Sequence, residues 1–229
     1  REDQAFVDDL AAEMLAQRSA TLPLQSLLAH PRLGPALDGD GPGGGESPLA
    51  RLLDDAVLGE MRGNLFEDDR LRFTYPQIGA YALVRVTLRR AGVPLLQAAC
   101  ELAAAADALP LAWEAALTLL VLRGDAATLA ALADDADPER RQLALEALVR
   151  SHGAQPARTH DTLAAWLEGG SPAQQRTALR AAFLIGPAAR ELLVRGALSS
   201  SPDLRLAVRD TLYLLWQGVA QGGGETRSQ

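Results

Sequence analysis

The sequence contains no lysine, and its 22 basic residues are all arginine. A nucleotide-binding P-loop, Schiff-base catalysis and a lysine general base each require a lysine side chain, so these chemistries are excluded within the 229 residues. The complete use of arginine is typical of a GC-rich bacterial genome. There is one cysteine, Cys100, which excludes an internal disulfide and indicates an intracellular, cytoplasmic setting.

Aromatic residues and long apolar runs are also scarce. Only 4% of the residues are aromatic while 48% are hydrophobic, so small and aliphatic side chains must build the core. The longest apolar run, residues 115–122, is far shorter than the ~18 residues that a membrane span needs, and no membrane partner is expected. The chain begins with Arg rather than Met and without a signal peptide. We therefore expect a fragment of a larger protein.

Negative charge is concentrated near the N-terminus. Residues 1–69 contain 14 acidic residues and 5 arginines, whereas residues 70–229 contain 15 acidic residues and 17 arginines. Phosphate backbones are repelled by an acidic surface, so the N-terminal third is unsuited to nucleic acid. Charge alone does not exclude nucleic acid for the nearly neutral remainder.

The N-terminal third predicts helices followed by a small hairpin. Phe6, Leu10 and Met14 recur at helical spacing in a helix over 2–20, with Asp8 on the solvent-facing side. The further predicted elements are a short helix over 23–30, a helical turn over 32–37, a glycine-rich loop over 38–47, a helix over 49–56 that could extend to Leu58, and strands at 64–66 and 70–74 around an acidic turn. Three helices and a hairpin are the order of a winged-helix module, which we assign to residues 1–75.

From residue 76 the pattern is helical throughout and becomes repetitive. Asp137-Pro138, Ser171-Pro172 and Ser201-Pro202 each combine an N-cap residue with proline at the first helical position. These starts lie 34 and 30 residues apart, a period typical of helical repeat proteins. Helices are predicted at 76–91, 93–108, 110–122, 125–134, 137–151, 159–168, 171–185, 188–198 and 201–218. Residues 219–229 are predicted to be a flexible tail.

The repeats resemble HEAT repeats. The first copy, Arg141-x-x-Ala144-x-x-Ala147-Leu148, matches the family pattern, and the second copy has Gln175 in place of the arginine. The resemblance implies a mainly α fold, with a right-handed HEAT-like α-solenoid over residues 76–218. Stacked repeats of this kind serve as binding surfaces for a protein partner more often than as enzymes.

A second resemblance lies in the segment Arg72-Phe73-Thr74-Tyr75-Pro76-Gln77-Ile78-Gly79-Ala80-Tyr81. It is similar to the segment that follows the winged helix in bacterial STAND-type signalling NTPases, including NACHT relatives. In these proteins a strand ending in Arg-Phe leads into a helix, and helical repeats often follow. Because this sequence has no nucleotide-binding domain, the resemblance implies a fragment that follows one. The junction positions that match are Arg72, Phe73, Thr74, Tyr75 and Tyr81.

Residues with catalytic or ligand-binding chemistry are few and scattered. The glycine-rich loop 39–45 has no lysine and is predicted to be a linker rather than a phosphate cradle. His30, His152 and His160 are predicted to be solvated loop residues, and Cys100 is predicted to be a buried small side chain without a base nearby. We expect no catalytic residue, no metal ligand and no cofactor, and we expect the chain not to be an enzyme.

Arginines on the first helices of the repeats are the main candidates for partner binding. This set consists of Arg141, Arg176, Arg180, Arg205 and Arg209. One interpretation is a ridge that follows phosphates, as in HEAT-like DNA glycosylases. The other is local pairing with acids such as Glu146 and Asp210, with the aliphatic stems packed over leucines. Interleaved acids and scarce aromatics favour the second interpretation and disfavour nucleic acid as the partner.

The preferred hypothesis is a non-catalytic interaction or sensor arm of a larger bacterial STAND-like signalling NTPase. Its helical repeats would bind a protein partner or maintain autoinhibition, and its winged-helix-like part would contact the nucleotide-binding domain of the same chain. The alternatives are a separate HEAT-like module that binds nucleic acid and a plain protein-interaction scaffold.

Overall fold

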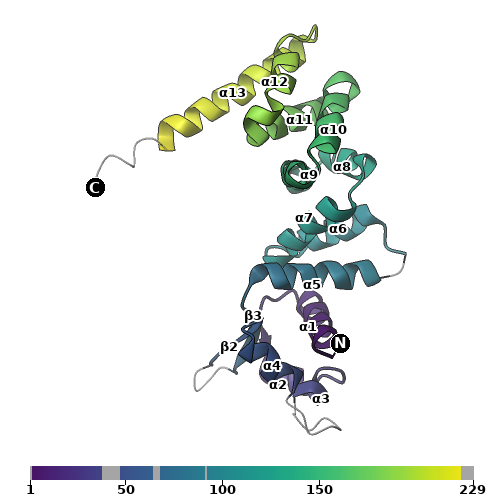
Figure 1. Cartoon of the computed structure of the whole chain (residues 1–229), viewed down its shortest axis with the longest axis vertical. Helices are drawn as coiled ribbons and strands as arrows, with labels where there is room; N and C mark the ends of the chain where they lie inside the picture. The colour runs from purple at the N-terminus through teal and green to yellow at the C-terminus, as the bar shows by residue number, and fades with distance from the viewer. Residues whose placement is uncertain (1, 38–46, 64–67, 91, 223–229) are drawn as a thin grey trace, which may run out of the picture. The chain divides into compact units, whose positions relative to one another are not determined.

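The protein is mainly helical, with one small antiparallel sheet (Figure 1). The computed structural model describes residues 2–37, 47–63, 68–90 and 92–222, with side chains described as far as Tyr213. The chain forms two compact units, Arg1–Leu122 and Arg123–Gln229, which we call unit 1 and unit 2. In the described residues no helix is both long and apolar enough to cross a membrane.

Unit 1 combines the sheet with short and medium-length helices. Its elements are α1 (Glu2–Gln17), β1 (Leu22–Pro23), α2 (Leu24–Leu28), α3 (Gly34–Leu37), α4 (Pro48–Asp54), β2 (Leu58–Met61), β3 (Arg70–Phe73), α5 (Pro76–Arg89), α6 (Leu95–Ala104) and α7 (Leu111–Arg123). β3 is the central strand and pairs antiparallel with both β1 and β2. Leu71 and Phe73 of β3 are buried and Arg72 is exposed, as the alternating pattern predicts.

The hairpin differs from the prediction in its first strand. The strand that forms the hairpin with β3 is β2, which begins at Leu58, while the predicted strand at 64–66 lies outside the described residues. The helix predicted over 49–56 ends at Asp54, so Leu58 is a strand residue rather than a helical one. β1 was not predicted, because two residues are too few to show an alternating pattern.

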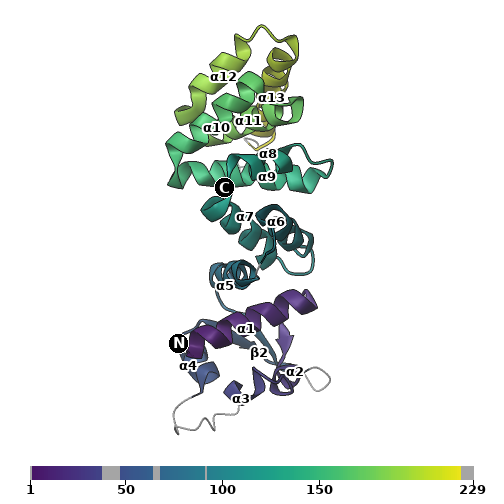
Figure 2. The same cartoon turned by 90° about the vertical axis from the view of Figure 1, so that its right-hand side faces the viewer.

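α1 and α5 pack against one another in unit 1, with α5 lying across α1 (Figure 2). Phe6, Leu10 and Met14 of α1 are all buried, which confirms the predicted apolar face. α5 approaches its neighbours closely at Gly79, where an added Cβ would lie 2.7 Å from a ring carbon of Phe73 and 2.9 Å from Leu111 Cδ1. The end of the predicted winged-helix module at residue 75 thus lies inside a continuous packed unit, just before the helix that closes over α1.

Unit 2 is built entirely from helices in its described part. Its elements are α8 (Ala126–Ala133), α9 (Pro138–Ala154), α10 (Pro156–Gly169), α11 (Pro172–Ile185), the short 3-10 helix η1 (Gly186–Ala189), α12 (Arg190–Ala197) and α13 (Pro202–Gly222). Consecutive helices pack on each other, and in addition α9 packs on α11 and α11 packs on α13. The three helices that begin with the repeated sequence signal are therefore neighbours in space (Figure 2).

The repeated helix starts are N-caps, as predicted. The Asp137 side chain accepts a hydrogen bond from the N–H of Glu139 at 2.9 Å, and the Ser201 hydroxyl accepts one from Leu204. Ser171 forms a complete capping box with Gln174, in which each side chain binds the other residue's backbone N–H. α13 runs to Gly222, beyond the predicted end at 218, and residues 223–229 of the predicted tail lie outside the described residues.

Small side chains fill the contacts between the repeat helices. Positions are counted from Asp137, Ser171 and Ser201 as zero. The seventh position is Ala144, Ala178 or Val208, and it is buried in all three copies. The eleventh position is buried in the first two copies, but Leu212 in the third is 49% exposed. Alanine at such positions lets helix axes approach to ~8–10 Å. The third copy thus departs from the other two in packing.

Candidate functional site

A groove of about 420 Å³ lies between α1, α4 and α5 in unit 1. Its lining residues are Asp3, Gln4, Val7, Leu52, Gln77, Ile78, Tyr81, Ala82 and Arg85. Apolar side chains from all three helices line it, together with the polar residues Asp3, Gln4, Gln77 and Arg85. A volume of this size falls within the range of ligand and peptide-anchor pockets.

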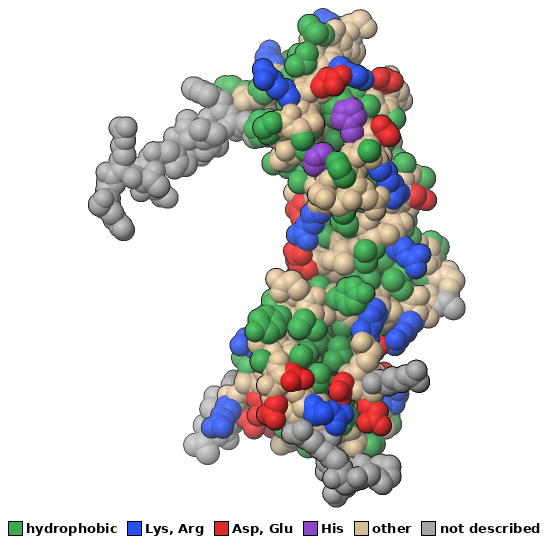
Figure 3. Space-filling model, in the orientation of Figure 1, with side chains coloured by type: hydrophobic (Ala, Val, Ile, Leu, Met, Phe, Trp, Pro, Cys, Tyr) green, Lys and Arg blue, Asp and Glu red, His purple; other side chains and the backbone are tan. Residues whose placement is uncertain are grey.

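Two tyrosines of the predicted junction are exposed, and one of them lines the groove. Tyr81, which lines the groove, is 54% exposed, and Tyr75, the N-cap residue of α5, is 53% exposed. Figure 3 shows hydrophobic side chains gathered over α5, above a band of acidic and basic side chains over α1 and α4. Exposed aromatic side chains beside a pocket are typical of residues that dominate protein–protein binding energy.

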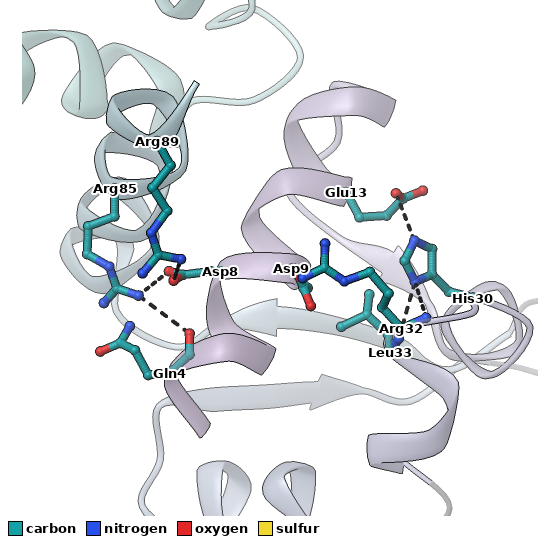
Figure 4. Close-up of polar contacts among 9 residues, drawn as sticks. All are labelled: Gln4, Asp8, Asp9, Glu13, His30, Arg32, Leu33, Arg85 and Arg89. Atoms are coloured by element: carbon teal, nitrogen blue, oxygen red, sulfur yellow. Dashed lines mark hydrogen bonds and ion pairs between the residues drawn. The ribbon is translucent and has the colours of Figure 1, made fainter. Parts of the chain in front are cut away.

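Two of the helices that line the groove, α1 and α5, are joined by a buried carboxylate. Asp8 on α1 is only 4% exposed, and Arg85 and Arg89 of α5 each donate to one of its oxygens, the Arg89 bond being 2.5 Å long (Figure 4). Arg85 also donates to the backbone carbonyl of Gln4. The prediction that Asp8 faces solvent is therefore wrong: two guanidinium groups compensate the desolvation of its charge and join α1 to α5.

A second charged contact fixes α4 against the beginning of α1. Arg51 on α4 donates from Nε to Asp3 at 3.1 Å and from Nη2 to the same oxygen at 2.5 Å, and its guanidinium lies 3.9 Å from Glu2. Ser47 caps α4 by accepting the N–H of Ala50. The three helices that line the groove are thus connected by side-chain contacts on both sides of α1, and the groove is preformed.

His30 has a structural role rather than the solvated one predicted. Its Nδ1 accepts the backbone N–H groups of Arg32 and Leu33, and its Nε2 lies 3.6 Å from Glu13 on α1 (Figure 4). The loop after α2 is thereby anchored to the face of α1 that carries Glu13. His152 and His160 lie in the helices α9 and α10, not in a loop.

The remaining junction residues divide between core and surface. Phe73 is buried and packs against α5 at Gly79, whereas Arg72 and Thr74 are exposed. The backbone N–H of Thr74 donates to Val57 and extends the pairing of β2 with β3. Of the five junction residues, Tyr81 lines the groove and Tyr75 begins the helix that forms its wall.

The predicted arginine set in unit 2 is not a uniform ridge. Arg141 donates to the carbonyls of Asp135 and Ala136, and Arg205 makes the same pair of contacts with Ser199 and Ser200. These side chains close the turn that precedes their own helix, at equivalent positions in two repeats. Such contacts give Arg141 and Arg205 a structural function.

The other arginines of the set are exposed. Arg209 pairs with the adjacent Asp210, as the local-pairing interpretation predicts. Arg176 and Arg180 lie one turn apart on α11, and neither has an ion pair or side-chain hydrogen bond to the described residues. Partner binding by this set stays a prediction, and Arg176 and Arg180 are the members best placed for it.

No metal or nucleophile site accompanies the groove in the described part of the chain. Among those residues, no group of three or more His, Cys, Asp or Glu side chains is arranged to hold a metal ion. Cys100 lies on α6 and is half-buried rather than fully buried. The groove can therefore offer apolar contacts and the charged side chains of Asp3 and Arg85 to a partner.

No family model matches the chain, and comparison with curated proteins and with solved structures finds no match either. The groove itself was missed in the sequence because its lining residues come from positions near 3, 52 and 81, and no local pattern connects them. The one local signal was the junction motif, which includes Tyr81 but does not show which helices pack beside it.

Proposed function

We propose that the chain is a non-catalytic protein-interaction arm of a bacterial STAND-like signalling NTPase. In this proposal unit 1 contacts the nucleotide-binding domain of the parent protein through the groove between α1, α4 and α5. Unit 2 is a HEAT-like array that binds a protein partner or maintains autoinhibition. The observation that supports the proposal most strongly is the half-exposed Tyr81 at a preformed apolar groove, within the segment that resembles the family.

The order of elements in residues 1–75 supports a winged-helix module. A helix is followed by a short strand, further helices and a two-stranded hairpin, and the first strand joins the same sheet beside β3. The acidic composition of this region opposes the usual DNA-binding use of such a module, since 14 acidic residues face only 5 arginines over residues 1–69. Contact with protein is the more favourable function for it.

The packing of unit 2 supports a helical array. The equivalent helices α9, α11 and α13 are neighbours, and Arg141 and Arg205 make equivalent contacts in two copies. The capping box of α11 also reaches the preceding repeat, because Ser171 and Gln174 both donate to Asp134 at the end of α8. Repeats that contact only their neighbours offer extended surfaces for a partner.

The reading frame upstream of this chain provides the first test. The proposal expects it to encode a nucleotide-binding domain with Walker motifs, whose lysine and acidic residues bind the phosphates and Mg²⁺. That domain, purified separately, should bind the 229-residue chain with 1:1 stoichiometry in calorimetry. An upstream frame without Walker motifs would contradict the STAND-like assignment.

A nucleic-acid-binding array is the second candidate, and the exposed pair Arg176 and Arg180 favours it. Two adjacent cations on one helix face can follow a phosphate backbone. Short duplex DNA should then bind at low salt and lose most of its affinity by ~200 mM salt. Absence of binding at low salt, or binding that Arg176→Ala and Arg180→Ala together leave unchanged, would reject this candidate.

A further inference from the structure

α13, the last helix of unit 2, is packed on one side and exposed on the opposite side. It packs on α11 and α12, and of its described side chains Leu204 and Val208, one turn apart, are the buried ones. On the opposite side Leu206 is 46% exposed and Tyr213 is 55% exposed. These two residues are seven positions apart, close to two helical turns, so they form one stripe along the helix. α13 has 21 residues, against 14 in α11 and 8 in α12, and it extends beyond both (Figure 1).

The exposed leucine of this stripe is specific to the third repeat. The position of Leu206 is occupied by Gln142 in α9 and by Arg176 in α11, and polar side chains suit a position that faces solvent. Conversely, Arg209 is exposed at a position where α9 and α11 each have a buried leucine. A further repeat stacked in the same way would bury this arginine, at a large cost in desolvation. The exchange therefore favours a partner of a different kind on the outer side of α13.

Charged side chains flank the stripe and are separated by sign. With 3.6 residues per turn, Arg205 and Arg209 lie on one flank, and Asp203 and Asp210 lie on the other. All four residues are exposed. Within the chain Arg209 donates to the adjacent Asp210, with 3.1 Å between Nη2 and Oδ1. A pair between two exposed side chains contributes little to stability, so it can be exchanged for an equivalent pair with another molecule.

We propose that α13 pairs with α13 of a second copy of the chain, with the two helices parallel and related by a two-fold axis. In this pair Leu206 and Tyr213 each contact the same residue of the other copy. The two-fold axis brings the arginine flank of each helix against the aspartate flank of the other, so the contact between Arg209 and Asp210 of the partner subunit forms twice. The pair of copies does not depend on the parent protein proposed above.

The separation of charge selects both the occupant and its direction. An antiparallel pair of α13 helices would place each flank against the same flank of the other copy, so that arginine meets arginine and aspartate meets aspartate. Such juxtaposed like charges oppose association. A parallel pair makes every flanking contact one of opposite sign, and the surface is therefore complementary to itself. Seven-residue spacing of the apolar residues, with opposite charges on the flanks, is the arrangement of parallel two-stranded helix pairs.

Sedimentation equilibrium of the full chain tests the pairing directly. A single helix pair is a small interface, and interfaces below ~1,200 Å² are typical of transient complexes. Over about 5–500 µM chain, the mass should rise with concentration from the 24.3 kDa of one chain toward that of two chains. A chain that stays single over this range leaves the outer side of α13 to a helix of another protein and overturns the proposal. A mass that rises beyond two chains would contradict a closed two-fold pair.

Two matched glutamine substitutions locate the interface. Leu206→Gln introduces the residue that α9 has at the equivalent, exposed position, so the helix should remain folded, which circular dichroism checks. Because one leucine is lost from each copy, the dissociation constant of the dimer should rise about tenfold or more. Leu198→Gln is the control, since Leu198 is 80% exposed and lies outside α13, and it should leave the dimer unchanged. No effect of Leu206→Gln, or an equal effect of both variants, would exclude α13 as the interface.

Charge exchange tests the parallel arrangement. Arg209→Asp makes both flanks acidic and should weaken the dimer by about tenfold, because like charges then meet on both sides. Adding Asp210→Arg to this variant exchanges the two flanks and should restore the dimer, since opposite charges meet again. Both side chains are exposed, so neither variant should unfold α13. An Arg209→Asp chain that pairs as strongly as the original, or a double variant that stays as weak as the single one, would overturn the parallel pair.

Discussion

The two units use different means to join their helices. Unit 1 contains 17 acidic residues and 10 arginines, which is the whole net charge of −7, and it joins α1 to α5 through a buried carboxylate and two arginines. Unit 2 contains 12 acidic residues and 12 arginines, and it joins its helices through alanines and repeated caps. Ion pairs between residues far apart in the sequence join helices in unit 1, whereas in unit 2 short sequence signals repeated along the chain determine where the helices begin.

This difference indicates where function is concentrated. Among the described residues of unit 2, side-chain contacts that close a turn or cap a helix recur from one repeat to another. In unit 1 the groove combines residues from three helices, and Tyr81 in its lining is 54% exposed although its side chain is large and aromatic. Departures from local consistency are typical of functional sites.

The largest expected effect comes from removing the buried carboxylate of unit 1. Asp8→Ala leaves Arg85 with a partly buried and uncompensated charge, so we expect a loss of about 3 kcal/mol in the free energy of unfolding. Hydrogen exchange should show the loss of protection in α1 and α5. The matched control is Asp9→Ala, whose partner Arg32 has a side chain 71% exposed, and it should cost below about 1 kcal/mol. Equal costs for the two variants would contradict a structural role of the buried clamp.

Unit 2 should instead be most sensitive to side-chain volume. Ala178→Leu adds a branched side chain at a fully buried repeat position on α11, and we expect it to cost about 2 kcal/mol through overpacking. Urea denaturation measures the effect. Ala165→Leu, at an exposed position of the adjacent α10, should change stability by less than about 0.5 kcal/mol. Similar values for both would show that the small residues do not determine the packing.

A smaller effect is expected from the helix caps. Ser171→Ala removes a capping box and a bond to Asp134, and it should cost about 1 kcal/mol. Ser201→Ala removes a single longer bond, 3.4 Å from the Leu204 nitrogen to Oγ, and should cost less. Thermal unfolding of the two variants compares them, and a larger loss for Ser201→Ala would contradict the order of cap strengths derived from the geometry.

The smallest effect is a dependence on acid pH in unit 2. The N–H of Asp137 and then the Arg140 side chain bind Asp135 and hold its pKa below the ordinary 3.8. A lowered folded pKa gives stability that is present above the ordinary value and lost as the pH falls through the folded one. Asp135→Asn should therefore flatten the acid limb of a stability profile between about pH 5 and pH 2. Asp161→Asn, an exposed aspartate on α10, serves as the control.

The helices could be predicted from sequence because their signals are local. The caps Asp125, Asp137 and Ser171 lie within three residues of the groups they bind, and the helices begin where these caps predict. Gly186, at φ 80°, ends α11 as expected of a glycine stop. α1 and α4 instead end at a left-handed Arg18 and Ala56, and neither residue type marks a helix end in the sequence.

The candidate site could not be predicted because its contacts span the chain. Asp8 was assigned to solvent since its helix alone cannot show that arginines 77 and 81 residues away will cover it. A charged residue on the polar side of an isolated amphipathic pattern is normally exposed. The identity of Tyr81 as a groove residue likewise depends on the packing of α4 and α1 against α5.

Binding of the full chain to the nucleotide-binding domain that the proposal expects upstream tests the central claim most directly. Tyr81→Ala should weaken this binding by about thirtyfold, as expected when a central aromatic side chain is removed from an interface. Tyr213→Ala provides the matched control, because Tyr213 on α13 of unit 2 is exposed to nearly the same degree. The account predicts a loss in Tyr81→Ala alone. Unchanged affinity in Tyr81→Ala, or an equal loss in Tyr213→Ala, would contradict it.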